Sequence, residues 1–238
     1  MEGAEKVLNH TGALVIYARP PVLGKVKTRL QPALTHAEGL ALYEAMLADV
    51  IERAAGGRTD RATTFLAWSE ACEPPASLKE VLGLVSVERQ VGGDLGERMA
   101  HTLQEKLRGG FGRVILVGAD SPNLPLDYLR QAFEALREVD LVYGPADDGG
   151  YYLVGARRLH PRIFQTMPWG TDRVLAITRQ RIKDGRISHR ELPRWYDVDT
   201  PADLVRLWKD LQHMKAKGAA EVPRRTLRML ASLVPGRL

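Results

Sequence analysis

The sequence predicts an α/β protein with a mostly parallel central sheet and helices on both faces. Short apolar runs alternate with amphipathic stretches along most of the chain, which is typical of strands connected by helices. The chain has 238 residues, of which 45% are hydrophobic and 26% charged, as in an ordinary soluble domain. A domain of this length buries enough surface to fold without disulfide bonds or structural metals.

Six apolar runs have the length and β-branched content of buried strands. Five longer stretches are amphipathic and predict helices. Thr171-Asp172 and Thr200-Pro201 are typical helix starts, the second with Pro at the first helical position. The predicted strands are residues 13–18, 63–68, 84–89, 114–118, 141–143 and 152–155, and the predicted helices are residues 36–55, 95–107, 126–137, 172–183 and 202–214.

The chain divides into one domain, residues 1–213, and a basic helical appendage, residues 214–238. The appendage holds six Lys or Arg residues and one Glu, which accounts for the whole formal net charge of +5. The rest of the chain is therefore near neutral, and we expect no nucleic-acid partner. A basic tail is typical of a helix that is solvated or that contacts another subunit. A homodimer formed through this segment is therefore one hypothesis for the assembly.

Three features predict a cytoplasmic protein. The lone cysteine, Cys72, gives no disulfide framework and suits a reducing compartment. Residues 1–10 lack the basic segment and apolar stretch of a secretory signal. No apolar run approaches the roughly 20 residues that a membrane helix needs, so no membrane span is expected.

The loop after the first predicted strand is a candidate phosphate site. Residues 19–29 contain four cations, several prolines and Gly24. Arginine offers planar paired donors and lysine a mobile point charge, both suited to a phosphate chain. The spacing is not that of a P-loop, and a solvated basic loop is the alternative. The cations are Arg19, Lys25, Lys27 and Arg29.

Three aspartates are candidate metal ligands. Asp120 follows an apolar strand, where Gly118 permits close approach of a ligand. Asp197 and Asp199 alternate, so on an extended segment they share one side and would repel each other without a cation between them. A turn cap at Asp120 and a helix start after Asp199 are the alternatives, and Asp203 is assigned to the helix start.

Two further segments could contact substrates. Asp148-Gly149-Gly150-Tyr151 combines a carboxylate, backbone amides that can meet a ligand and an aromatic ring, although for this segment alone an acidic hairpin turn is the favoured interpretation. In residues 91–99, Asp94 or Arg98 could contact a base or sugar. Asp94 is also a good helix cap, and that interpretation is favoured.

Four of these segments, in this order, resemble a bacterial family of GT-A-like proteins assigned as glycosyltransferases, related to phospholactate and molybdenum cofactor guanylyltransferases. The resemblance covers residues 13–211. Each motif is weak alone, but the four together are specific. They are Ala18-Arg19-Pro20-Pro21 with Gly24 to Leu30, Gly118-Ala119-Asp120-Ser121-Pro122, Asp148-Gly149-Gly150-Tyr151, and Asp197-Val198-Asp199-Thr200-Pro201.

The resemblance implies a nucleotide-diphospho-sugar transferase (GT-A) fold. It also implies that Lys27 and Arg29 belong to a phosphate-binding loop, that Asp120 is the first carboxylate for Mg²⁺ or Mn²⁺, and that Asp199 with Asp197 is the second. The Asp148 turn would face the second substrate. Relatives often have Trp-Ser-Thr where this chain has Trp169-Gly170-Thr171, so a hydroxyl role at position 170 is in doubt, while Trp169 and Thr171 stay candidate acceptor contacts.

The implied function is metal-dependent transfer from a nucleotide donor, with Lys27, Arg29 and Asp120 as catalytic residues. We expect glycosyl transfer from a nucleotide-diphospho-sugar to a small-molecule acceptor. Nucleotidyl transfer, in which a phosphorylated small molecule attacks a nucleoside triphosphate and pyrophosphate leaves, uses the same residues and is the alternative. A non-catalytic nucleotide-binding module is the third reading.

Overall fold

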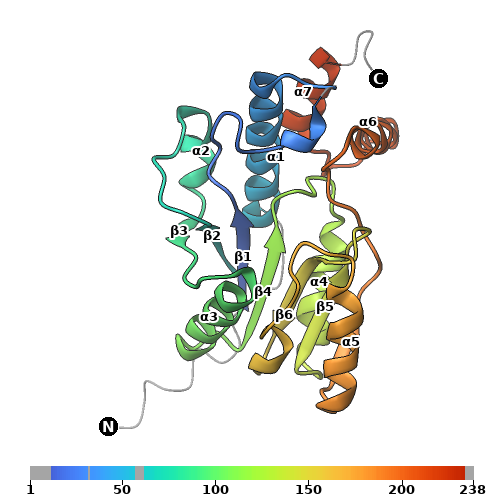
Figure 1. The fold of residues 1–238 in the computed structure, drawn as a ribbon. Helices are drawn as coiled ribbons and strands as arrows, with labels where there is room; N and C mark the ends of the chain where they lie inside the picture. Colours follow the sequence, from blue (N-terminus) through green and yellow to red (C-terminus); the bar gives the residue numbers. More distant parts are fainter. Residues whose placement is uncertain (1–11, 32, 57–61, 234–238) are drawn as a thin grey trace.

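The computed structural model describes residues 12–31, 33–56 and 62–233. Within them a seven-stranded sheet has the order β3-β2-β1-β4-β6-β5-β7 (Figure 1). β6 is antiparallel to both of its neighbours, and the other strands share one direction, as expected for a mostly parallel sheet. The strands are β1 (Gly12–Ala18), β2 (Thr63–Trp68), β3 (Ser86–Arg89), β4 (Arg113–Gly118), β5 (Leu141–Pro145), β6 (Tyr151–Ala156) and β7 (His189–Glu191).

Helices cover both faces of the sheet, because successive side chains of the central strands point to opposite sides. Leu14 and Ile16 of β1 face the core under α1, α2 and α4. Ala13 and Val15 face the core under α3 and α5. These helices are α1 (His36–Gly56), α2 (Lys79–Leu82), α3 (Leu95–Arg108), α4 (Leu126–Ala135) and α5 (Val174–Asp184), and the short 3₁₀ helices are η1 (Thr28–Leu30), η2 (Ala76–Leu78) and η3 (Pro161–Ile163).

A third core lies where α6 (Pro201–Ala216) and α7 (Arg224–Leu233) pack beside α1 (Figure 1). Its centre is formed by Leu42 of α1, Leu207 of α6 and Leu230 of α7, all fully buried. The division expected between residues 213 and 214 therefore falls inside α6, and α7 is packed against the domain.

Most predicted elements are confirmed, with ends shifted by a few residues. The helix start expected at Thr171-Asp172 is wrong, because α5 begins at Val174 and the Thr171 hydroxyl instead donates to the carbonyl of Pro168 at 2.8 Å. The start at Thr200 is confirmed as a capping box with Asp203. β7 was missed because its three residues are exposed and charged, without an apolar pattern.

None of the described helices is both long and apolar enough to cross a bilayer. Residues 1–10 and Arg237, which entered the sequence arguments, lie outside the described residues.

Candidate functional site

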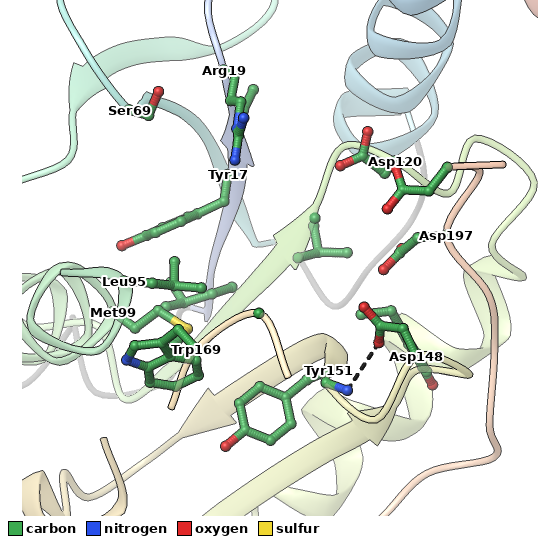
Figure 2. Close-up of a pocket in the computed structure, with 18 of the residues that line it drawn as sticks. Tyr17, Arg19, Ser69, Leu95, Met99, Asp120, Asp148, Tyr151, Trp169 and Asp197 are labelled. Carbon is green, nitrogen blue, oxygen red and sulfur yellow. Dashed lines mark hydrogen bonds between the residues drawn. The ribbon is translucent and has the colours of Figure 1, made fainter. Parts of the chain in front are cut away.

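A cavity of about 540 Å³ opens beyond the carboxyl ends of β1, β2 and β4, the edge where parallel sheets bind ligands. Its volume is within the range of about 300–1,000 Å³ that ligand pockets occupy. Figure 2 shows carboxylates along one side, at Asp120, Asp148 and Asp197, and a largely apolar group opposite, at Tyr17, Leu95, Met99 and Trp169.

The loop after β1 folds so that Lys27 points inward. Lys27 has a φ of 50°, in the left-handed region that residues with a Cβ seldom adopt. It directly precedes η1, whose Leu30 is fully buried and anchors the loop. As a result the Lys27 side chain is only 2% exposed. Holding a non-glycine residue in this conformation costs on the order of 1 kcal/mol, a strain that is often found at functional sites.

The Lys27 ammonium is paired with two of the predicted metal carboxylates. It forms an ion pair with Asp120, donates a hydrogen bond to the carbonyl of Val198 at 2.7 Å, and lies 3.5 Å from Oδ1 of Asp199. Arg29 forms an ion pair with the other oxygen of Asp199. The two cations expected to meet phosphate therefore neutralise carboxylates in this structure.

Other cations face the cavity without such partners. Arg19 and Lys25 line it, are exposed, and have no carboxylate partner among the described residues. Arg98 also lines it, with its Nε donating to the carbonyl of Gly92 at 3.1 Å. These three side chains are the ones positioned to meet an entering phosphate chain.

The aspartates are brought together by contacts between two distant segments. The backbone N–H of Val198 donates to the carbonyl of Asp120 at 2.9 Å, and the Ser121 hydroxyl lies 2.7 Å from Oδ1 of Asp197. Val198 is fully buried in the third core, so Asp197 and Asp199 on either side of it both line the cavity. The predicted alternation of these two aspartates is confirmed.

The carboxylates fit a hard divalent cation in ligand type and in charge. Burial and repulsion from Asp120, with smaller contributions from Asp148 and Asp199, raise the pKa of Asp197 to about 7, a sign of negative charge that a cation would relieve. In the described part of the chain no three His, Cys, Asp or Glu side chains form a ready-made metal cluster. Asp120 and Asp199 would have to exchange Lys27 for the ion.

The β5–β6 turn supplies a fourth carboxylate. Asp148 accepts a hydrogen bond from the backbone of Gly150 at 2.9 Å (dashed in Figure 2), and it has no cation partner among the residues described. Gly149 has a φ of 88°, and a Cβ there would lie 2.6 Å from the backbone of Asp172. The Gly149 carbonyl accepts from Leu175 at 2.9 Å, which fastens the turn to α5. The hairpin turn is therefore confirmed, and Asp148 and Gly150 of this turn line the cavity.

An aromatic wall stands next to this turn. The rings of Tyr151 and Trp169 meet edge to face, with centroids 6.2 Å apart and planes at 71°. The Tyr151 hydroxyl is hydrogen-bonded to Thr178, which fixes the ring. A Cβ on Gly96 would lie 2.8 Å from Trp169, so the indole packs directly on the backbone of α3. Such a wall suits the apolar face of a sugar or another ring.

Most of the predicted site residues line this cavity, but three do not. Asp94 caps α3, accepting from the backbone of Glu97 at 2.8 Å, as the structural interpretation predicted. Gly24 and Gly149 are not part of the lining, and both adopt positive φ in turns next to lining residues. The predicted residues that line the cavity are Arg19, Lys25, Lys27, Arg29, Arg98, Gly118, Asp120, Asp148, Gly150, Tyr151, Trp169, Thr171, Asp197 and Asp199.

Sequence reasoning missed several lining residues. Tyr17 is the next-to-last residue of β1, and its hydroxyl donates to the carbonyl of Arg98 at 2.9 Å or to Thr102 at 2.7 Å. Ser69 and Gln90 directly follow β2 and β3, so the rule that ligands bind beyond strand ends could have identified both. Leu95 and Met99 carry an ordinary helical pattern with no functional signal.

Comparison with known structures supports the fold. A putative nucleotide-diphospho-sugar transferase from Desulfovibrio desulfuricans G20 is 30% identical, with a TM-score of 0.79 over 93% of this chain and 94% of that one. A cytidylyltransferase from Leptospira borgpetersenii is 13% identical, with a TM-score of 0.54 over 89% and 96%. CMP:2-keto-3-deoxy-manno-octonic acid synthetase, in complex with CTP, is 13% identical, with a TM-score of 0.51 over 87% and 99%. The nucleotide-diphospho-sugar transferase fold that the motifs imply is confirmed.

Among curated proteins, no sequence matches this chain. The bacterial family described as "Uncharacterized protein conserved in bacteria (DUF2064)" matches residues 53–171, which include the loop of Asp120 and the Asp148 turn. By this match over half of its length, the chain belongs to the DUF2064 family.

Proposed function

We propose that this protein transfers a sugar from a nucleotide-diphospho-sugar to a small-molecule acceptor. The observation that carries the proposal is the arrangement of the cavity. Cations from the loop after β1 and carboxylates from three separate segments line one cavity, and the aromatic wall of Tyr151 and Trp169 lines the same cavity beside the Asp148 turn. The 30% identical relative bears the name of such a transferase, which supports the same choice.

The donor would bind with its diphosphate near the cations. Arg19, Lys25 and Arg98 are placed to take up its charge. Asp120 and Asp199, with Asp197 beside them, would hold Mg²⁺ or Mn²⁺, which when bound would stabilise the negative charge of the diphosphate. The protein's part on this side is positioning and electrostatics.

The acceptor would bind between Asp148 and the aromatic wall. In the transfer, the acceptor oxygen forms a bond to the anomeric carbon, and the bond from that carbon to the diphosphate oxygen breaks. Two lining carboxylates, Asp148 and Asp197, have no cation partner in the described chain. Asp148 is the one in the turn beside the aromatic wall, so it is the group placed to take the acceptor's proton. Tyr151, Trp169 and Thr171 would orient the acceptor ring.

Nucleotidyl transfer is the second candidate, favoured by one observation. Cytidylyltransferases share the fold, and the Lys27-Thr28-Arg29-Leu30 loop resembles that of guanylyltransferases. In that reaction a phosphorylated acceptor attacks the α-phosphate of a nucleoside triphosphate and pyrophosphate leaves.

The two reactions release different products, so one assay separates them. The protein would be incubated with Mn²⁺ and a panel of nucleotide sugars or nucleoside triphosphates, each with candidate acceptors, and scored for nucleoside diphosphate and for pyrophosphate. Nucleoside diphosphate from a nucleotide sugar supports the proposal, and pyrophosphate from a triphosphate favours the alternative. Binding of a nucleotide in a thermal-shift measurement, without either product, would indicate a non-catalytic module.

A further inference from the structure

We propose that Lys27 is an internal counter-ion of the metal site, so that a divalent cation binds Asp120 and Asp199 tightly only when a phosphate group draws the ammonium away. The inference rests on the proposed function, because it takes these two aspartates to be the metal carboxylates. Beyond binding phosphate, Lys27 would control when the metal ion can bind to Asp120 and Asp199.

Protein acceptors meet every N–H donor of the Lys27 ammonium. An ammonium has three N–H donors, and three acceptors surround this one: Asp120, the Val198 carbonyl at 2.7 Å and Asp199 Oδ1 at 3.5 Å. The side chain is 2% exposed, so water cannot replace these partners without a change in structure.

The same oxygens cannot serve Lys27 and a metal ion equally well. Asp120 and Asp199 carry two negative charges, and Lys27 and Arg29 balance both. A divalent cation that enters this pair meets the positive charge of a buried ammonium at short range, where protein charges are poorly screened. Metal affinity is therefore low while Lys27 stays in place.

A bound phosphate group could take over the Lys27 ammonium from Asp120 and Asp199. Exposed Arg19 and Lys25 lie on the same loop as Lys27 and line the same cavity, so a phosphate that they hold is within the reach of that loop. It offers the ammonium new anionic oxygens, which frees Asp120 and Asp199 for the metal. Metal and phosphate then strengthen each other's binding, as linkage requires of coupled ligands.

The test is a titration with Mn²⁺ alone, in which free Mn²⁺ is counted by electron paramagnetic resonance, repeated with inorganic phosphate and a protein-free blank. Lys27→Met should bind Mn²⁺ at least tenfold more tightly than the native protein. Phosphate should tighten Mn²⁺ binding severalfold in the native protein and have little effect in Lys27→Met. If Lys27 only supported the structure, Lys27→Met would bind Mn²⁺ more weakly than the native protein, because loss of the lysine would distort the carboxylates.

Lys106→Met is the matched control. Lys106 is also a largely buried lysine in an ion pair, with Glu88 of β3, but it is not part of the cavity lining. Its loss removes the same charge and should leave Mn²⁺ affinity unchanged. Lys27→Arg keeps the charge and should bind Mn²⁺ as weakly as the native protein.

The outcomes separate this inference from the proposed function. Asp120→Asn should abolish the tight Mn²⁺ binding of Lys27→Met. If Lys27→Met binds Mn²⁺ no more tightly than the native protein, while Asp120→Asn still weakens binding, the counter-ion role is wrong and the metal site stands. If Asp120→Asn changes Mn²⁺ binding in neither background, the metal assignment itself fails. Should Lys27→Met not fold, the native protein alone decides, because Mn²⁺ affinity that is independent of phosphate overturns the inference.

Discussion

The guanidinium of Arg53 donates a hydrogen bond to the carbonyl of Leu124 at 2.9 Å. A second hydrogen bond from the same side chain goes to the carbonyl of Pro122. Arg53 belongs to α1, whereas both carbonyls belong to the loop that leaves β4 just after Asp120. One side chain from α1 thus holds the shape of the loop that presents a candidate metal carboxylate.

Replacing Arg53 by Met should lower the free energy of unfolding by about 2–3 kcal/mol, because the carbonyls of two buried residues lose their donor. Urea unfolding monitored by circular dichroism measures the loss. Arg130→Met is the control, since Arg130 is exposed and its one ion-pair partner among the residues described is Asp127, at 2.9 Å on its own helix, so its loss should cost less than about 0.5 kcal/mol. Equal losses in the two variants would contradict the role given to Arg53.

Alanine substitutions at two glycines with positive φ can separate the energetic cost of a steric clash from that of backbone strain. Gly149 has a φ of 88°, and a Cβ there would lie 2.6 Å from the Asp172 backbone, whereas Gly170 has a φ of 78° and nothing within 4 Å. Gly170→Ala should cost about 1 kcal/mol from conformation alone. Gly149→Ala should cost at least about 2 kcal/mol more, because the clash is with backbone, which cannot turn aside. Thermal unfolding of the two variants tests this difference. Similar losses of stability would show that the Gly149 turn can move away from the Asp172 backbone.

Asp197 should make stability depend on pH. Its pKa is raised from 3.8 to about 7, so between about pH 4 and pH 7 the folded protein holds a proton that the unfolded chain has released. The free energy of unfolding contributed by this group is therefore present at low pH and falls as the pH rises through that interval. Asp197→Asn removes the effect, and because the carboxylate is partly solvated we expect a relative gain on the order of 2 kcal/mol at pH 8 over pH 5.

Urea unfolding at both pH values, with a chelator to remove divalent cations, checks this expectation. A difference between native and Asp197→Asn protein that is the same at pH 5 and pH 8 would show that Asp197 titrates normally.

The sequence predicted six of the seven described strands, with ends shifted by a few residues, because buried strands such as β1 and β4 consist almost wholly of apolar residues; β7 lacks that pattern and was missed. It also predicted loops that line the cavity, since residues that follow parallel strands gather at one edge. It did not predict that Lys27 pairs with Asp120, 93 positions away, because that contact depends on a left-handed turn at a non-glycine residue. Local sequence patterns show which loop carries a charged residue, but tertiary packing decides which residue it forms an ion pair with.

Asp49 links the C-terminal helix to the domain. Its buried carboxylate, on α1, accepts hydrogen bonds from the backbone N–H groups of Thr226 at 2.7 Å and Arg225 at 3.2 Å, at the start of α7. Asp49→Ala leaves these donors unsatisfied and should cost about 2 kcal/mol. Trypsin should then cleave within α7 faster than in the native protein. Glu52→Ala, which removes only the exposed partner of Arg225, should change the cleavage rate little.

Asp120→Asn should lower transfer activity by a factor on the order of 100 or more, once a donor and acceptor have been identified, because one electrostatic contact in the transition state is lost. The change keeps the size of the side chain and an oxygen that can accept a hydrogen bond from Lys27, so the fold should persist, with a lower melting temperature because the buried ammonium loses one anionic partner. Asp127→Asn makes the same change on the exposed start of α4 and should be fully active. A fully active Asp120→Asn protein would show that the carboxylate beyond β4 only shapes its turn, the alternative that the sequence left open.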